Sequence, residues 1–131
     1  MYAATVTGRD SADLATTNYT TFLDLRNTLD GKVTCDTTIT VSSMTDCTWT
    51  AYGSRTVSAA ATELWLNGQK MTGKVTATTA AAMVFDLPGL RYFRMGFVPS
   101  GTTNATDDVV VTYAYNDYLT SAATDGALRV E

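Results

Sequence analysis

The chain has no histidine, and it has only two cysteines and two prolines among its 131 residues. The absence of histidine excludes Ser-His-Asp and Cys-His catalysis, histidine-ligated metals and imidazole pH switches. Two cysteines cannot complete a four-cysteine zinc site. So little proline also argues against a Pro-rich disordered chain. We therefore predict that the protein is not an enzyme and carries no cofactor.

Basic residues and long apolar runs are scarce as well. The chain carries 9 Lys and Arg against 13 Asp and Glu, a net charge of -4, which argues against binding nucleic acid by neutralising phosphates. No stretch approaches the roughly 18 consecutive apolar residues of a membrane span. The N-terminus lacks a basic leader followed by an apolar run, so we expect no secretory signal and no membrane partner.

The residues that are present favour β-structure. Threonine is abundant, and Thr, Val and aromatic residues suit the pleated, half-buried surface of a sheet. Residues 32–42 alternate strictly, which predicts a strand with one dry face. That face consists of Val33, Cys35, Thr37, Ile39 and Val41. The length and the hydrophobic content of 45% suit one domain with its own core, residues 1–131.

Further strands are expected at regular intervals along the chain. Asn67-Gly68 between two β-like runs predicts a type I′ hairpin, with a return strand whose Lys and Thr side chains face solvent. Several short strands separated by turn residues predict an antiparallel β-sandwich or jelly roll. The other expected strands are 19–26, 46–52, 80–87, 90–98 and 108–116.

The two ends of the chain are less regular. Residues 11–15 could form one turn of helix with Ser11 as its N-cap. Residues 1–17 are a candidate N-terminal arm. In the C-terminal stretch no large apolar residue falls between Leu119 and Leu128, so residues 118–131 are a candidate tail, either docked on a neighbour or frayed.

Cys35 and Cys47 lie twelve positions apart, and three states are open for them. A direct hairpin pairing would put the turn at Val41, inside the best part of a strand, so a disulfide would have to bridge sheets or loops. The alternatives are two buried thiols that act as small hydrophobes, or a link between chains. A catalytic thiol is not expected without histidine.

Two adjacent acids, Asp107 and Asp108, begin the last expected strand. Neighbouring strand residues point to opposite faces, so the pair could not flank one glycosidic bond. A calcium site with Asn104 would lack the EF-hand pattern. We interpret both acids as solvated loop residues that keep a strand end soluble.

Aromatic and basic residues interleave in Arg91-Tyr92-Phe93-Arg94. This pattern occurs in nucleic-acid and sugar platforms. We favour a central strand that is buried on both sides, with each arginine paired to an acid at the sheet edge. Trp49 and Trp65 are likewise interpreted as core residues rather than as a ligand platform.

The run Leu87-Pro88-Gly89-Leu90-Arg91-Tyr92-Phe93-Arg94, followed by Ser100-Gly101 and a final apolar strand, carries a family resemblance. With it, the block 63–115 resembles small β-sandwich proteins of tailed bacteriophages, in particular capsid decoration (cement) and head-fibre modules. The block covers less than half of the chain, and the half that contains both cysteines does not contribute.

The resemblance implies a virion structural protein on the capsid surface that binds and stabilises the shell. Its partners would be the major capsid protein or other virion proteins. Thinly charged sheet edges favour a homo-oligomer, for which the resemblance implies a trimer. Such modules act through surfaces, and we name Tyr92, Arg94 and Tyr118 as candidate subunit contacts.

Other functions stay open at this point. The chain could be a tail, baseplate or connector component of the same particle. It could be a carbohydrate-binding module that uses Trp65, Trp49 or Tyr92 as a stacking platform, or, with little weight, a small glycoside-active enzyme.

Overall fold

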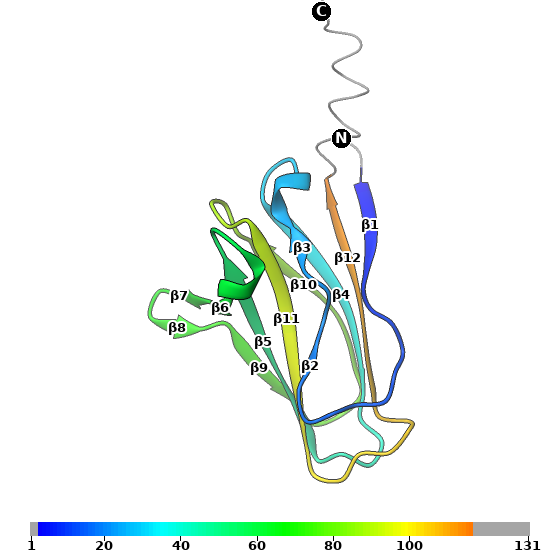
Figure 1. The fold of residues 1–131 in the computed structure, drawn as a ribbon. Coiled ribbons are helices and arrows are strands. Elements are labelled where there is room, and N and C mark those ends of the chain that lie inside the picture. The colour runs from blue at the N-terminus through cyan, green and yellow to red at the C-terminus, as the bar shows by residue number, and fades with distance from the viewer. Residues whose placement is uncertain (1–2, 117–131) are drawn as a thin grey trace, which may run out of the picture.

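The protein is an all-β sandwich, as the sequence predicts (Figure 1). The computed structural model describes residues 3–116. One sheet, here called sheet A, has four antiparallel strands in the order β1-β12-β4-β10. These strands are β1 (Ala3–Arg9), β12 (Asp108–Asn116), β4 (Lys32–Thr40) and β10 (Thr79–Asp86).

The second sheet, sheet B, is built around two long central strands that pair along their whole length. Short strands flank this pair: β2 and β3 both pair with β11, and β6 and β9 both pair with β5. The strands are β11 (Tyr92–Ser100), β5 (Asp46–Ser54), β2 (Asn18–Tyr19), β3 (Leu23–Asp24), β6 (Thr62–Glu63) and β9 (Thr72–Val75). A 3-10 helix, η1 (Leu25–Asn27), follows β3, and another, η2 (Ser58–Ala60), follows β5.

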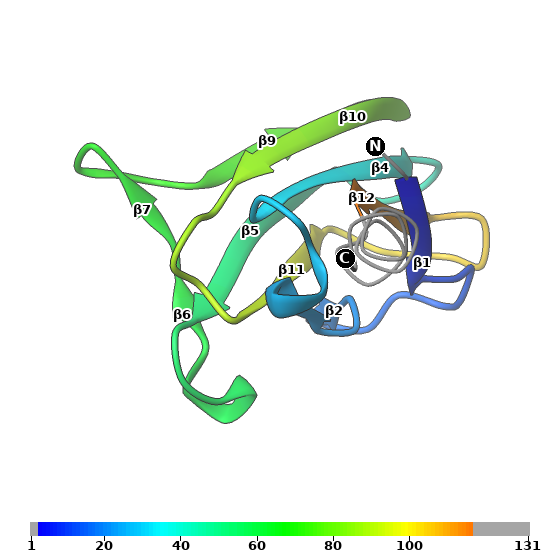
Figure 2. The ribbon, with the colours of Figure 1, turned by 90° about the horizontal axis from the view of Figure 1, so that it is seen from above.

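The two sheets form two layers with the core between them (Figure 2). Alternate residues of each long strand point inward, which is why the dry face predicted for residues 32–42 is buried from Val33 to Ile39. Aromatic rings join the layers: Phe93 of sheet B lies 5.1 Å from Phe85 and 6.1 Å from Tyr113, both of sheet A, between ring centroids. The fully buried large side chains include Tyr113, Phe93, Phe97, Ile39 and Met95.

The predicted hairpin is confirmed. Strands β7 (Trp65–Leu66) and β8 (Gln69–Lys70) pair around a turn whose Asn67 and Gly68 have φ values of 53° and 80°. Positive φ at both central residues defines the type I′ turn, and Asn-Gly adopts it with little strain. This hairpin projects from the side of the sandwich (Figure 1).

The prediction of one continuous strand over residues 19–26 is wrong. The chain forms β2, leaves the sheet, and re-enters as β3 before η1 begins. The register with β11 explains the break, because Tyr19 lies opposite Gly96 but Leu23 lies opposite Phe93, so this segment advances by four residues where β11 advances by three. One extra residue on one strand is the mark of a β-bulge, and here the Thr21 amide donates to the Gly8 carbonyl of sheet A at 2.8 Å.

The N-terminal predictions also need correction. Ala3–Arg9 is not an arm but strand β1 of sheet A, paired with β12. Residues 11–15 form no helix and run as a loop. Strand β11 extends further than expected, to Ser100. The candidate tail 118–131 and Tyr118 lie outside the described residues. Within residues 3–116, no helix is long and apolar enough to cross a membrane.

Candidate functional site: an aromatic patch on sheet B

The outer face of sheet B carries a cluster of aromatic rings around one arginine. Tyr92 and Arg94 lie two positions apart on β11 and therefore share a face. The register places Tyr52 of β5 opposite Arg94, and Tyr19 of β2 opposite Gly96. We call this cluster the aromatic patch, and it consists of Tyr19, Phe22, Tyr52, Tyr92 and Arg94.

The Arg94 guanidinium is the centre of the patch. Its central carbon lies 3.7 Å from the ring centroid of Tyr19 and 4.4 Å from that of Phe22. Both distances are within the roughly 6 Å range of a cation–π interaction. Each of these rings packs edge-on against another, Tyr19 on Tyr52 at 5.6 Å and Phe22 on Tyr92 at 6.1 Å. One cation thus links two aromatic pairs.

The predicted pairing of the two arginines with acids is wrong. The ion pairs formed within residues 3–116 include neither Arg91 nor Arg94. Arg91 instead donates to the Thr56 carbonyl at 3.2 Å and lies 4.8 Å from the Tyr92 centroid. The buried Nε atoms of both arginines lack a hydrogen-bond partner among the described residues. Aromatic faces stabilise the Arg94 charge where carboxylates were expected.

A glycine lets the tyrosines of the patch meet. A Cβ atom on Gly96 would lie 2.8 Å from Cε1 of Tyr52 and 3.0 Å from Cε1 of Tyr19. The two rings therefore close over the bare backbone of β11 at this position. Burial raises the pKa of the Tyr52 hydroxyl, and the neighbouring Tyr19 adds to that effect.

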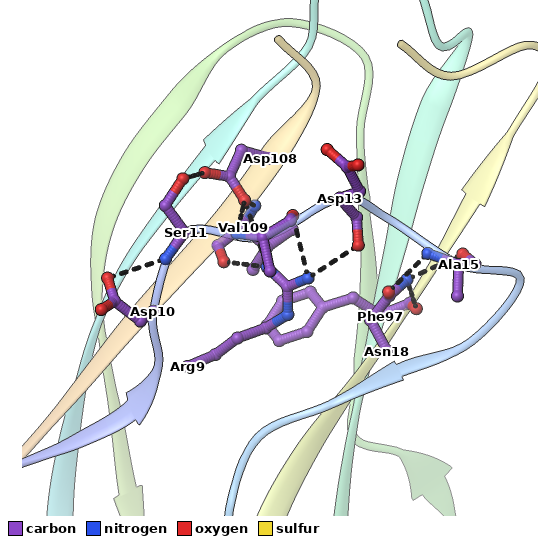
Figure 3. A network of polar contacts seen from close by, with 10 residues as sticks. Arg9, Asp10, Ser11, Asp13, Ala15, Asn18, Phe97, Asp108 and Val109 are labelled. Atoms are coloured by element: carbon purple, nitrogen blue, oxygen red, sulfur yellow. Dashed lines mark hydrogen bonds and ion pairs between the residues drawn. The ribbon is translucent and has the colours of Figure 1, made fainter. Parts of the chain in front are cut away.

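Asn18, the residue before Tyr19, bonds to Ala15 and to Phe97 (Figure 3). The buried Asn18 side chain accepts from the amide of Ala15 at 2.7 Å and donates to its carbonyl at 2.9 Å. The same side-chain amide donates to the Phe97 carbonyl of β11 at 3.2 Å. These bonds attach the start of β2 to sheet B and so deliver Tyr19 to the aromatic patch.

A second set of contacts holds the loop that precedes β2 (Figure 3). Arg9 pairs with Asp108 at 3.2 Å and donates to the carbonyls of Val109 and Ala12. Asp108 also accepts from the Ser11 hydroxyl. Burial alone would raise the pKa of Asp108. The hydrogen bonds from Ser11, from nearby amides and from Arg9 have the larger effect, so the pKa is lowered. These contacts hold the loop against the end of β12.

Asp107 is not a solvated loop acid, because its side chain is fully buried. It accepts hydrogen bonds from the amides of Ser42 at 2.6 Å, Ser43 at 2.9 Å and Asn104 at 2.8 Å, and from the Ser43 hydroxyl at 2.7 Å. Burial alone would raise its pKa, but these donors hold the pKa well below its usual value. Asp107 therefore joins two loops as an acceptor of amides, an environment opposite to that of a cation ligand.

Both cysteines are free and buried, Cys35 in sheet A and Cys47 in sheet B. Of the three states considered, the structure has the buried thiols. Burial raises the thiol pKa to about 12 for Cys35 and to about 11 for Cys47. Neither thiol is therefore an activated nucleophile.

The two tryptophans have different environments. Trp49 packs against the core, 6.2 Å from Phe85 between ring centroids, and covers Gly73. Trp65 lies on the projecting hairpin with 63% of its surface exposed. The interpretation of Trp65 as a core residue is therefore wrong. An open groove of about 540 Å³ is lined by Tyr52, Thr62, Glu63 and Trp65.

The structure thus brings together two of the three predicted contact residues, Tyr92 and Arg94. Sequence reasoning missed Tyr19, Phe22 and Tyr52. Alternation could have found Tyr52, because Cys47, Trp49 and Ala51 take the inner face of that strand and leave Tyr52 on the outer one. No pattern in the sequence pairs Tyr19 with Gly96, since that contact depends on which strand lies beside β2.

Comparison with known proteins gives a likeness of fold. No protein-family model matches the chain, and no curated protein matches it. Among solved structures, the chain is similar to the crystal structure of the SPBc2 prophage-derived protein YomS, with a TM-score of 0.56 and 18% sequence identity. The likeness covers 86% of this chain and 91% of that one. The two chains therefore share an architecture over nearly their whole length.

Proposed function

We propose that the protein is a non-enzymatic structural protein of a tailed-bacteriophage virion, and that it decorates the capsid. The aromatic patch carries this proposal. Tyrosine, phenylalanine and arginine are the residue types that dominate protein–protein contacts, and here they cluster on one sheet face. The fold shared with a prophage-derived protein supports a phage origin.

In this role, the aromatic patch lies against the major capsid protein or another virion protein. Tyr19 is 44% exposed, so a partner could still bury much of its ring. A protein that binds only the intact shell stabilises it in proportion to the logarithm of its free concentration above the dissociation constant. We further propose that it acts as a homo-oligomer, for which a trimer is expected from the family resemblance.

A thermal-release assay tests the proposal. Particles that lack the protein should release their genome at a lower temperature, and added wild-type protein should restore the higher one. Tyr19→Ser should restore it poorly, whereas Leu29→Ser, which removes a side chain of similar exposure (42%) outside the patch, should restore it fully. Identical melting with and without the protein would reject capsid decoration, and recovery of the protein on tails would support the tail alternative.

One observation favours a second candidate, a carbohydrate-binding module. The groove that Tyr52 shares with the patch is also lined by Trp65, which is 63% exposed, and by the polar residues Glu63 and Thr62. An aromatic face with adjacent hydrogen-bonding groups suits a sugar ring. The Lys70 Nζ atom lies 3.4 Å from Oε2 of Glu63, and this ion pair links the hairpin to β6. A glycan screen that finds binding to wild type, and none to Trp65→Ala, would support this candidate over the first.

A further inference from the structure

Strand β10 is an open edge of sheet A. It pairs with β4 on one side, and no strand within residues 3–116 pairs with its other side (Figure 2). The strand is eight residues long, and its register with β4 runs without a bulge from Thr79 to Asp86. A regular edge of this length is a template on which another strand can pair.

The ladder shows which backbone groups of β10 are open. The amide of Leu87 donates to the Gly31 carbonyl at 2.9 Å, and this pair comes directly after Asp86 and Lys32 in the register. Hydrogen-bonded and non-hydrogen-bonded pairs alternate along an antiparallel ladder. The groups that face β4 are therefore those of Thr79, Ala81, Met83 and Phe85, and those that face outward belong to Ala80, Ala82, Val84 and Asp86.

The usual protections of an edge strand are missing from β10. It contains no proline or lysine, and its one charged residue, Asp86, stands at its end. Val84 is 68% exposed in the middle of the strand. An uncharged, regular edge of this kind promotes aggregation unless a specific partner covers it.

We propose that the partner is a second copy of this chain, whose own β10 pairs antiparallel across a two-fold axis at Met83. In this register Ala82 lies opposite Val84 of the second copy, and Ala80 lies opposite its Asp86. Every outward N–H and C=O group of the four open residues then finds a partner. Side-chain sizes match in this register, because each small alanine lies opposite a larger side chain of the second copy. The two Asp86 carboxylates lie at opposite ends of the strand pair.

This contact fixes the symmetry of the assembly. A two-fold contact joins copies in pairs, so the β10 contact by itself gives a dimer. If a trimer also forms through another surface, the β10 contact joins two trimers into a hexamer. The inference rests on β10 alone and does not depend on the proposed role in the virion.

Native mass and sedimentation of the full chain test the inference. The chain mass is 14.0 kDa, and wild type should sediment as twice this mass or as a hexamer. Ala82→Pro should halve the native mass. The N–H group that proline removes points away from β4, so no hydrogen bond within the chain is lost. Val84→Lys should do the same by placing a charge on the edge. Val6→Lys, the same change at a 43% exposed site on β1, should leave the mass unchanged.

A cross-link tests the register independently of any folding defect. A mixture of Ala82→Cys and Val84→Cys proteins should form a disulfide-linked dimer on oxidation, since these positions face each other across the axis. Each variant alone should cross-link much less. A wild-type protein that is a monomer or a lone trimer at micromolar concentrations, or a mixture without a cross-link, would overturn the proposal.

Discussion

Removal of the Arg94 charge should uncouple the two aromatic pairs of the patch. The guanidinium lies 3.7 Å from the Tyr19 centroid and 4.4 Å from that of Phe22. A cation–π contact contributes about 0.5–1 kcal/mol at exposed sites and about 2 kcal/mol when desolvated. Arg94 is half-buried, so we expect Arg94→Gln to lower the free energy of unfolding by about 1–2 kcal/mol. Arg94→Lys should recover only part of this loss, because an ammonium group does not stack as a planar guanidinium does.

A double-mutant cycle measures the contact itself. Urea denaturation of wild type, Arg94→Gln, Tyr19→Leu and the double variant should give a coupling free energy of about 0.5–1 kcal/mol. The denaturant slope should stay constant, so that shifts in midpoint report stability. The matched control combines Tyr19→Leu with Arg26→Gln, because Arg26 pairs with Asp24, whereas the cation over the Tyr19 ring is Arg94. That control cycle should be additive.

The salt dependence separates the observed contact from the ion pair that the sequence suggested. An exposed ion pair weakens as salt rises, whereas a half-buried contact at short range is screened much less. The coupling should therefore persist at about 1 M salt, where the Debye length falls to about 3 Å. Additivity of Arg94→Gln and Tyr19→Leu to within about 0.3 kcal/mol would refute the reasoning.

Two further predictions concern buried groups. Asp107→Asn should lower the melting temperature, because the amide nitrogen of the new side chain would face N–H donors. The folded pKa of Asp107 is depressed, so wild type should lose stability as the pH falls below the usual pKa of 3.8, and the variant should lose less. Denaturation curves between about pH 5 and pH 2 measure this difference. Cys35 and Cys47 should resist a thiol-specific reagent at neutral pH until the protein is unfolded, because both thiols are buried. Wild type should also melt at the same temperature with and without reductant. A melting temperature that falls in reductant would instead indicate a disulfide.

Much of the fold follows from local patterns in the sequence. Strict alternation located β4, and Asn67-Gly68 located the hairpin, because both signals depend only on neighbouring residues. The prediction for 19–26 failed because its apolar residues match a strand, whereas its register with β11 shifts by one residue between β2 and β3. That shift depends on pairing with β11, which is far away in the sequence.

The environment of charged residues was harder to predict than the strands. Nothing local distinguishes Asp107 from Asp108, yet one is fully buried among amide donors and the other lies against Arg9 and Ser11. Arg94 was placed correctly within a strand, but the rings that surround it come from β2 and from the connection to β3. Such environments are set by which strands become neighbours, and alternation carries no information about that.

The two proposed contacts support each other through geometry. The two-fold axis of an antiparallel strand pair stands perpendicular to the sheet, so pairing through β10 keeps both sandwiches on the same side of the joined sheet A. Both copies of sheet B then lie on one side, and both aromatic patches face the same way. Two identical contacts on one rigid body bind a repetitive surface with an avidity that can exceed either affinity by about 10²–10⁴. A capsid is such a surface, so loss of the β10 contact should weaken the capsid binding proposed above even though every residue of the patch remained in place.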